Sequence, residues 1–335
     1  MKIAVYGASG FTGGLVVAEL IRRGRQPVLV GRDEIRLRAV AGGAEVRVAG
    51  LDDIPALARA FDGCAAVVNC AGPFSRWGEP VIRAALAAGC HYVDTTGEMQ
   101  YLHAVLSDVG PDAERAGVTV VPGLADDGGP GDLIAHLTAA RVPDVADLLI
   151  ADLRSGGGAS RGTARSMVAV LGTGPLEYAD GNWHPAEMTS GATILVPSES
   201  DPVPVQSFAL PGVATIPRHV AAGRVRSAIR AETAAMFAGL TADIVESVPE
   251  VVDAELRAAG RWLMLAEATA GDGARARGWV TGPDSYGLTA VIAVEGALRL
   301  AAGGSPAGAL PPALAFEPAD FLDFLTAYGV TWKVE

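Results

Sequence analysis

The chain has 335 residues, about the length of two domains, and half of its residues are hydrophobic. A chain of this size buries about 75% of the surface that its unfolded form exposes, which excludes a small disulfide-stapled scaffold and a disordered protein. Its 26 basic and 38 acidic residues give a net charge of −12. This acidity disfavours a general nucleic-acid binder, which needs clustered Lys and Arg.

The use of lysine and cysteine narrows the chemistry further. The only lysines are Lys2 and Lys333, so no interior lysine is present to form a Schiff base. The three cysteines, Cys64, Cys70 and Cys90, are too few and too scattered for a disulfide framework or a zinc site, and they indicate a reducing cytoplasm. The chain has no run of about 18 uncharged apolar residues and opens without a secretory signal pattern, so we expect no membrane association.

The first 125 residues alternate short apolar runs with helical patterns. The expected strands are residues 3–6, 27–30, 44–49, 65–70, 91–94 and 118–122. The expected helices are residues 13–23, 54–61, 78–88 and 99–116. Continuous apolar strands that alternate with helices form a parallel sheet covered on both faces. Residues 1–125 are therefore predicted to form an α/β, doubly wound dinucleotide-binding domain of the Rossmann type.

The pattern changes after Gly123. Residues 126–131 form a dense turn cluster. The elements expected after it are helices at 132–141 and 160–171, strands at 147–154, 192–197 and 207–210, and tail helices at 286–302 and 318–328. The Pro-rich stretch 301–312 is expected to be a surface loop. We expect residues 126–284 to form a second α+β domain with a mixed sheet, which serves substrate binding and dimerisation.

A glycine motif lies directly between the first strand and the first helix, with Gly7, Gly10 and Gly13 at a spacing of three. Gly7 allows the tight turn, Gly10 lets the backbone approach a pyrophosphate, and Gly13 lets helix and strand pack closely. The amides at the start of the helix attract the phosphate charge. We therefore predict a dinucleotide-binding loop, formed by Gly7, Ser9, Gly10, Phe11, Thr12 and Gly13.

The end of the second strand predicts which cofactor binds. Enzymes that use NAD usually carry Asp or Glu there, whereas this chain carries Arg32, which can pair with a 2′-phosphate and stack on adenine. Asp33 is expected to cap the next helix. Asp52 is expected either to contact the adenine or, like Asp53, to cap a helix. We predict NADP(H) rather than NAD, with a solvated Arg32 as the alternative.

The fourth strand leads into a second loop at the expected cofactor site. Ligands of this architecture bind at the carboxyl ends of the strands, so this loop is predicted to lie beside the nicotinamide ribose. The cofactor-binding candidates here are Asn69, Ala71, Gly72 and Pro73. Cys70 is interpreted as a small buried residue rather than a nucleophile, because no His at motif spacing is present to activate it.

Two related enzyme classes are excluded by missing residues. Short-chain dehydrogenases need a Tyr-x-x-x-Lys pair, and semialdehyde dehydrogenases need a cysteine beyond the dinucleotide domain; this chain has neither. It resembles instead the saccharopine dehydrogenase-like reductases, including the trans-acting enoyl reductases of polyketide and lipid assembly. The matching segments are Gly7–Gly13, Val30–Arg32, Asn69–Phe74, Gly89–Glu98, Ser160–Thr163 and Tyr286–Ala290. The segment Gly123–Asp132 departs from the family pattern, which puts the usual substrate in doubt.

The resemblance implies a hydride reductase of C=C or C=N bonds whose C-terminal helices, within residues 285–335, return to the first domain. Hydride transfer also needs a proton donor. The candidates are Asp126, Tyr101 and His184, the last in a predicted loop. Glu98, Ser160 and Thr163 are candidate substrate-binding residues, with an ordinary helix cap as the alternative for the last two. We expect Asp126 and Asp127 to form a turn, with no metal site. His91 is expected to be a satisfied strand residue and His103 a surface residue.

These observations predict a cytoplasmic, NADPH-dependent reductase of a small or carrier-linked substrate in specialised metabolism. A homodimer is expected, without nucleic-acid or membrane partners. A saccharopine-type amino-acid dehydrogenase remains an alternative; it would need arginines for the substrate carboxylates, for which the candidates are Arg154, Arg161, Arg165 and Arg218. A non-catalytic NADP-binding sensor that binds a protein partner is the second alternative.

Overall fold

The computed structural model describes residues 1–172, 174–186, 191–197 and 199–335. Two units can be distinguished, and each is described by itself. The first unit comprises Met1–Thr96, Tyr101–Ala125 and Tyr286–Phe316. The second unit comprises Gly97–Gln100, Asp126–Ser285 and Glu317–Glu335.

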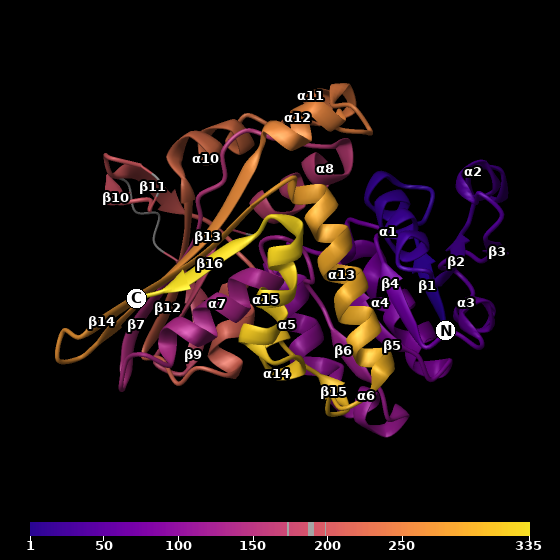
Figure 1. The fold of residues 1–335 in the computed structure, drawn as a ribbon, viewed down its shortest axis with the longest axis horizontal. Helices are drawn as coiled ribbons and strands as arrows, with labels where there is room; N and C mark the ends of the chain where they lie inside the picture. Colours follow the sequence, from indigo (N-terminus) through magenta and orange to yellow (C-terminus); the bar gives the residue numbers. More distant parts are fainter. Residues whose placement is uncertain (173, 187–190, 198) are drawn as a thin grey trace. The chain divides into compact units, whose positions relative to one another are not determined.

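The first unit is built on a parallel sheet of seven strands in the order β15-β6-β5-β4-β1-β2-β3 (Figure 1). The strands are β1 (Lys2–Tyr6), β2 (Gln26–Gly31), β3 (Glu45–Val48), β4 (Ala66–Asn69), β5 (His91–Asp94), β6 (Thr119–Val121) and β15 (Gly308–Ala309). The chain winds outward from β1 through β2 and β3, then returns to β4 on the other side of β1. The carboxyl ends of β1 and β4 therefore form the switch point at which such sheets bind ligands.

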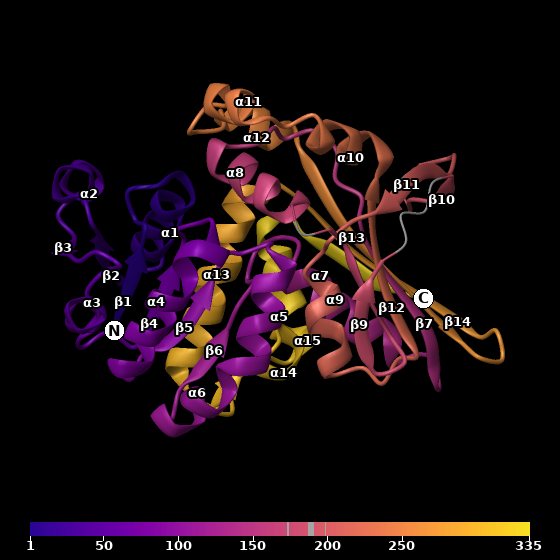
Figure 2. The same cartoon turned by 180° about the vertical axis from the view of Figure 1, so that it is seen from behind.

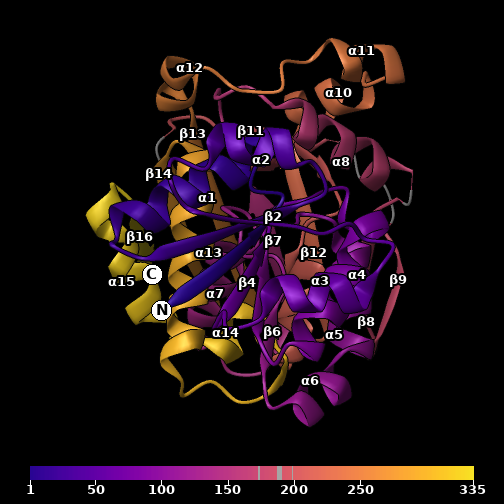
Figure 3. The same cartoon turned by 90° about the vertical axis from the view of Figure 1, so that its right-hand side faces the viewer.

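Helices cover both faces of this sheet. They are α1 (Phe11–Arg22), α2 (Glu34–Val40), α3 (Ile54–Phe61), α4 (Phe74–Ala87), α5 (Met99–Asp108), α6 (Gly110–Ala116), α13 (Ser285–Ala302) and α14 (Pro312–Ala315). In Figure 3, α1 and α13 lie on one side of the strands and α3 and α4 on the other. The single helix expected over 99–116 is instead two helices, α5 and α6. Pro111 lies in the first turn of α6, where a backbone amide has no partner within the helix, so its missing N–H loses no hydrogen bond. The loop expected over 301–312 contains β15, which pairs with β6.

The second unit is built on a mixed sheet of nine strands (Figure 2). The strands are β7 (Val145–Asp152), β8 (Leu176–Ala179), β9 (Asn182–Pro185), β10 (Ala192–Ile194), β11 (Val203–Ser207), β12 (Arg224–Arg230), β13 (Arg261–Ala270), β14 (Arg275–Pro283) and β16 (Thr331–Val334). The strand expected at 207–210 is wrong, since β11 ends at Ser207. The hairpin of β13 and β14, which contains the longest strands among the described residues, was not anticipated.

Helices of the second unit pack around this sheet. They are α7 (Gly129–Ala139), α8 (Arg161–Leu171), α9 (Gly212–Thr215), α10 (Ala231–Ala238), α11 (Ala242–Ser247), α12 (Ala254–Ala259) and α15 (Pro318–Leu325). α7 packs on β13 and β14 at two glycines: a Cβ on Gly131 would meet Met264, and one on Gly278 would overlap Thr138. α7 begins at Gly129, three residues earlier than expected, so the turn before it is confined to 126–128.

The C-terminal residues differ from the expected packing of all of residues 285–335 on the first domain. Residues 286–316 belong to the first unit, but Glu317–Glu335 belongs to the second. The reason is backbone pairing: β16 lies antiparallel to β14 and completes the edge of the second sheet. α15, which precedes β16, accordingly packs on α7.

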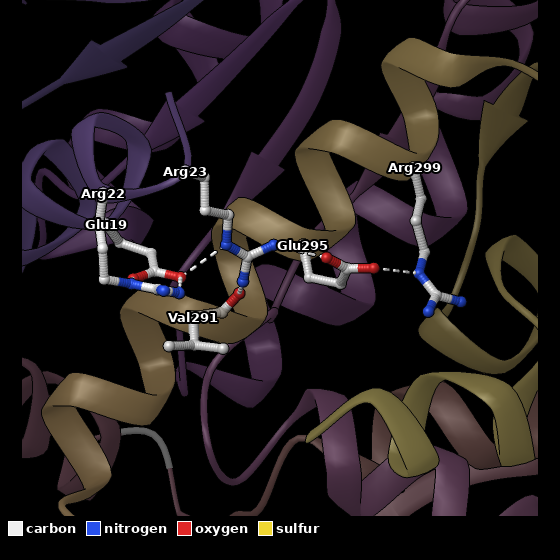
Figure 4. A network of polar contacts seen from close by, with 6 residues as sticks. All are labelled: Glu19, Arg22, Arg23, Val291, Glu295 and Arg299. Carbon is white, nitrogen blue, oxygen red and sulfur yellow. Dashed lines mark hydrogen bonds and ion pairs between the residues drawn. The ribbon is translucent and has the colours of Figure 1, made fainter. Parts of the chain in front are cut away.

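Within the described residues, α13 is the one helix long and apolar enough to cross a membrane, with a mean hydropathy of 1.2 and 61% of the window buried. Core helices pass the same test, so this is weak evidence for a membrane span. Polar contacts tie α13 to α1: Glu295 bonds Arg23 at 2.6 Å and Arg299 at 2.7 Å, while Glu19 also bonds Arg23 (Figure 4). These contacts are those of a helix packed inside the first unit.

Candidate active site

The loop between β1 and α1 has the geometry of a phosphate-binding turn. Gly7 adopts φ +79°, a conformation that favours glycine, and its amide donates to Val30 O at 3.1 Å. The Gly10 amide donates back to Gly7 O at 2.9 Å, which closes the turn. Gly10 is then the N-cap of α1, and it has no side chain that could cap the amides of the first helical turn. Such amides bind anions well.

Gly13 is required by close packing. A Cβ at this position would lie 2.2 Å from Gly7 O and 2.9 Å from Ala8 Cα. No side chain fits there, so helix α1 approaches the loop more closely than any other residue type would permit. A Cβ on Gly7 would similarly meet Ala71 at 3.1 Å, so the loop after β4 lies against the glycine loop. This cradle fits the pyrophosphate of a dinucleotide.

The end of β2 carries the predicted specificity residue. Arg32 is exposed, and in the described parts of the chain its guanidinium forms no ion pair. The expected helix caps are confirmed: Asp33 accepts from the Arg36 amide in α2. Burial raises the pKa of Tyr6, while the charge of Arg32 lowers it and that of Asp52 raises it. Arg32 and Asp52 thus both act on Tyr6, the last residue of β1.

The loop after β4 is shaped from inside by Asn69. This fully buried side chain accepts from the Ala71 amide at 3.0 Å and donates to Tyr92 Oη at 3.0 Å. Asn69 therefore positions the loop that carries Ala71, Gly72 and Pro73, the other cofactor-binding candidates. Burial raises the pKa of the Cys70 thiol to about 12, which agrees with the inert role expected for it.

A buried carboxyl group organises the ends of β5 and β6. Asp94 accepts from Tyr92 Oη at 3.0 Å and Tyr101 Oη at 3.1 Å, and from the amides of Thr96 at 3.1 Å and Gly123 at 2.8 Å. Complete burial raises the pKa of Asp94 to about 6 in spite of these bonds. Burial also raises the pKa of Tyr101 well above its usual value. Tyr101 is thus a buried member of this network through its hydrogen bond to Asp94.

In the second unit, three carboxyl groups gather around one guanidinium. Arg154 binds Asp152 Oδ2 through Nη2 at 2.5 Å and Nε at 2.7 Å, and Asp126 Oδ2 at 3.2 Å. Asp127 lies beside this group. Burial and the charge of Asp126 raise the pKa of Asp127 to about 7, against the opposing effect of Arg154. Asp126 is thus the ion-pair partner of Arg154, and the raised pKa of Asp127 favours its protonated form more than that of an ordinary carboxyl group.

Two chain connections lead from the Asp94 network towards Asp127. Thr96, whose amide bonds Asp94, is followed by Gly97, on which a Cβ would lie 2.9 Å from Asp127 Oδ2. Gly123, whose amide also bonds Asp94, precedes Asp127 by four residues, which span at most about 14 Å.

The other candidates lie in the second unit at separate places. Glu98 is buried and accepts from Ser166 Oγ at 3.0 Å. Ser160 caps α8 by accepting from the Thr163 amide at 3.2 Å, as the alternative interpretation expected. The prediction that His184 lies in a loop is wrong: it is exposed on strand β9, opposite Glu177 of β8. β8 and β9 form a short hairpin where a loop was expected, and β8 also pairs with β12.

Three further histidines have hydrogen-bond partners, one in the first unit and two in the second. His91 accepts from the Thr119 amide at 3.0 Å, which confirms it as a satisfied strand residue. In the second unit, His219 contacts Asp132 at 2.8 Å and His136 at 3.0 Å. Sequence reasoning missed this pair, because 83 residues separate its two histidines. Within the described ranges, no group of three His, Cys, Asp or Glu side chains is arranged to hold a metal ion.

The arginines that a dicarboxylate substrate would need are engaged elsewhere. Arg154 binds Asp152 and Asp126. The three others contact groups of their own: Arg161 bonds Val248 O at 2.8 Å and Glu250 at 3.3 Å, Arg165 bonds Glu246 at 2.7 Å, and Arg218 lies 5.3 Å from the centre of the Trp183 ring. No cluster of arginines with uncommitted charge exists among these four.

Comparison with known families and proteins adds an independent line of observation. Residues 3–121 match the family model for the saccharopine dehydrogenase NADP-binding domain. A putative trans-acting enoyl reductase of Mycobacterium tuberculosis is 33% identical over 185 residues, 51% of this chain and 44% of that protein. A saccharopine dehydrogenase-like oxidoreductase of Homo sapiens is 28% identical over 152 residues, 39% of this chain and 35% of that protein. The matches confirm the predicted resemblance and the predicted cofactor, NADP(H).

The similarity to these relatives covers only part of their length. The matched regions span only about a third to under a half of these relatives' own lengths. A lipid droplet localized protein of Caenorhabditis elegans matches in the same way, 33% identical over 39% of this chain and 34% of that protein. The apo saccharopine dehydrogenase (L-Glu forming) of Saccharomyces cerevisiae covers the whole chain with a TM-score of 0.66 at 13% identity, which shows a common fold and confirms the predicted fold class.

Proposed function

Since residues 3–121 of this chain match the family model for the saccharopine dehydrogenase NADP-binding domain, we propose that the chain is an NADPH-dependent reductase of C=C or C=N bonds in a small or carrier-linked substrate. The observation that carries the proposal is the glycine cradle, which admits a pyrophosphate and excludes any side chain at Gly13. The names of the relatives, an enoyl reductase and a saccharopine dehydrogenase-like oxidoreductase, support the two bond types.

In this proposal the first unit holds the cofactor. The amides at the start of α1 and the backbone of Gly10 face the pyrophosphate, and Arg32 pairs with the 2′-phosphate. Ala71, Gly72 and Pro73 line the site at the switch point between β1 and β4. When bound, NADPH supplies a hydride. Asn69 and the Asp94 network hold the surrounding loops in place through the hydrogen bonds described above.

We assign the proton to Asp127. Its pKa, raised to about 7, leaves a large share of the carboxyl group protonated at neutral pH, and a general acid is most effective when its pKa lies near the working pH. The O–H bond of Asp127 breaks as the proton passes to the carbon or nitrogen next to the atom that accepts the hydride. The carboxylate that remains is stabilised by Arg154 and is reprotonated from water, so no further reactant is needed. Asp126 keeps the pKa of Asp127 high by its negative charge.

The engaged arginines favour this proposal over an amino-acid dehydrogenase of the saccharopine type. Binding a dicarboxylate would require breaking ion pairs such as Arg165–Glu246 or displacing Asp152 from Arg154. The protonated Asp127 likewise favours a reductase over a non-catalytic sensor, because a sensor gains nothing from a carboxyl group whose charge is suppressed by burial.

The test is a screen of enoyl thioesters and cyclic imines, followed by loss of NADPH absorbance at 340 nm. We expect one class to be reduced, and Asp127→Asn to lower kcat by about a hundredfold or more while NADPH affinity stays unchanged. Asp108→Asn, at an exposed position at the end of α5, is the matched control and should leave kcat unchanged. NADPH binding without turnover of any acceptor would favour the sensor. Full activity of Asp127→Asn would overturn the assignment of the proton donor.

A further inference from the structure

The connection between β14 and α13 is a single residue, Asp284. Its backbone lies in the left-handed region, with φ +40°. Among non-glycine residues, Asp and Asn tolerate this region best, so Asp suits the turn. The conformation still costs some free energy relative to a right-handed one. A conformation of this kind persists only where neighbouring contacts hold it.

The contact that holds Asp284 is an ion pair within the second unit. Arg257 of α12 binds both carboxylate oxygens through Nη1, at 3.2 Å to Oδ1 and 2.8 Å to Oδ2. The Arg257 side chain is 16% exposed and that of Asp284 is 30% exposed, so the pair is partly shielded from water. Such a pair is stronger than an exposed one and holds the Asp284 turn at the end of β14.

Two residues beyond Asp284, the chain reaches the glycine loop of the first unit. The Tyr286 ring lies 5.0 Å from the Phe11 ring, at an interplanar angle of 53°. Phe11 is the first residue of α1 and directly follows Gly10 of the cradle. Both rings are half-buried, so each keeps a surface that a ligand can cover. No use of Tyr286 was anticipated from the sequence beyond its place in a family-like segment.

We propose that Tyr286 is a further cofactor-binding residue, which closes the pyrophosphate end of the NADP(H) site against Phe11, and that the Arg257–Asp284 ion pair positions it. The proposal rests on the cofactor assigned above. The ring shields the amide-to-phosphate hydrogen bonds from water, which strengthens them. The phenol hydroxyl supplies a donor of the kind that phosphate oxygens accept.

The first experiment compares cofactor fragments in the full-length protein by calorimetry or fluorescence. We expect Tyr286→Ala to weaken NADPH binding about tenfold, and to weaken 2′-phospho-ADP-ribose, which retains the pyrophosphate, by a similar factor. Affinity for 2′,5′-ADP, which lacks the pyrophosphate, should be unchanged. Tyr286→Phe keeps the ring and removes the hydroxyl, so its NADPH affinity should lie between that of the wild type and that of Tyr286→Ala. If Tyr286→Ala does not fold, Tyr286→Leu, which keeps an apolar side chain, should show the same pattern.

The matched control is an aromatic pair of the same kind away from the glycine loop. The Phe324 and Tyr328 rings of the second unit lie 5.5 Å apart at 46°, and both are half-buried. Tyr328→Ala should leave NADPH affinity unchanged. If the wild type binds no NADPH, the proposed function itself fails. If the wild type binds and Tyr286→Ala binds equally well, only the present inference is overturned.

The positioning role of the ion pair is tested by Asp284→Asn. Asn tolerates the left-handed backbone but removes the charge. We expect NADPH affinity to fall about threefold to fivefold with 2′,5′-ADP affinity unchanged, and Arg257→Lys, which keeps a cation, to retain most of the NADPH affinity. Equal losses for NADPH and 2′,5′-ADP would indicate a general structural effect and overturn the positioning role. Unchanged NADPH affinity in Asp284→Asn would overturn it as well.

Discussion

Replacing Gly13 by Ala tests the cradle on which the cofactor assignment depends. The new Cβ would lie 2.2 Å from Gly7 O, whereas ordinary contacts begin at 3.4 Å. Helix and loop must therefore separate by about 1 Å. Overpacking of this kind lowers the free energy of unfolding by about 1–3 kcal/mol, and the higher helix propensity of Ala offsets about 1 kcal/mol of that loss.

The effect on binding should exceed the effect on stability. The amides that face the phosphate belong to the same turn as Gly13, so a displacement of about 1 Å takes them out of hydrogen-bond range. A loss of about 2 kcal/mol corresponds to a weakening of NADPH binding by about thirtyfold. The assay is a titration of nicotinamide fluorescence, with urea unfolding of the same samples.

Gly14 provides the matched control. It is the next residue of the same helix, and a Cβ there would meet nothing within 4 Å. Gly14→Ala should raise the free energy of unfolding by about 0.5–1 kcal/mol and leave NADPH affinity unchanged. The reasoning is refuted if Gly13→Ala binds NADPH within twofold of the wild type, or if both substitutions weaken binding equally.

Three further predictions concern single side chains. Arg32→Ala should weaken NADPH binding at least about tenfold without changing NADH binding. Arg38→Ala, in the next helix α2 and ion-paired with Glu34, should change neither affinity. Equal losses for both nucleotides in Arg32→Ala would contradict the 2′-phosphate contact. Tyr101→Phe removes a buried hydrogen bond to Asp94 and should cost about 1.5–3 kcal/mol in urea unfolding, with kcat retained; a large loss of kcat would restore Tyr101 as a proton donor. The folded pKa of Asp127, about 7, lies above its unfolded value, so the folded state binds the extra proton and its stabilising effect is lost as pH rises from about 4 to 7. Asp127→Asn should remove that part of the decline, and parallel stability curves for wild type and variant from pH 4 to 8 would refute the raised pKa.

The first unit was predictable because its strands are buried on both faces. Residues 3–6 of β1 and 27–30 of β2 form uninterrupted apolar runs, and helices α2 and α3 each begin at an aspartate cap. The second unit was less predictable. Residues 262–266 of β13 are all apolar and buried, so they show no alternation, and a short apolar run of this kind is equally typical of a buried helix.

The candidate site also has a part that the sequence predicts and a part that it does not. The glycine loop is local, so spacing alone predicts it. The choice between Asp126 and Asp127 depends on Arg154 and Asp152, which the fold brings to the pair from β7 and the residues after it. The role of Tyr286 depends on Phe11, 275 positions earlier in the chain. Contacts across such separations are set by the tertiary fold and leave no pattern in a single sequence.

The most direct test of the account is a parallel titration of the purified protein with NADPH and NADH, followed by nicotinamide fluorescence. The account predicts NADPH binding with a Kd in the micromolar range and NADH binding at least about tenfold weaker, because only NADPH carries the 2′-phosphate that Arg32 meets. Equal affinities would contradict the assignment of Arg32. Failure of both nucleotides to bind would contradict the central claim that the glycine cradle holds a dinucleotide.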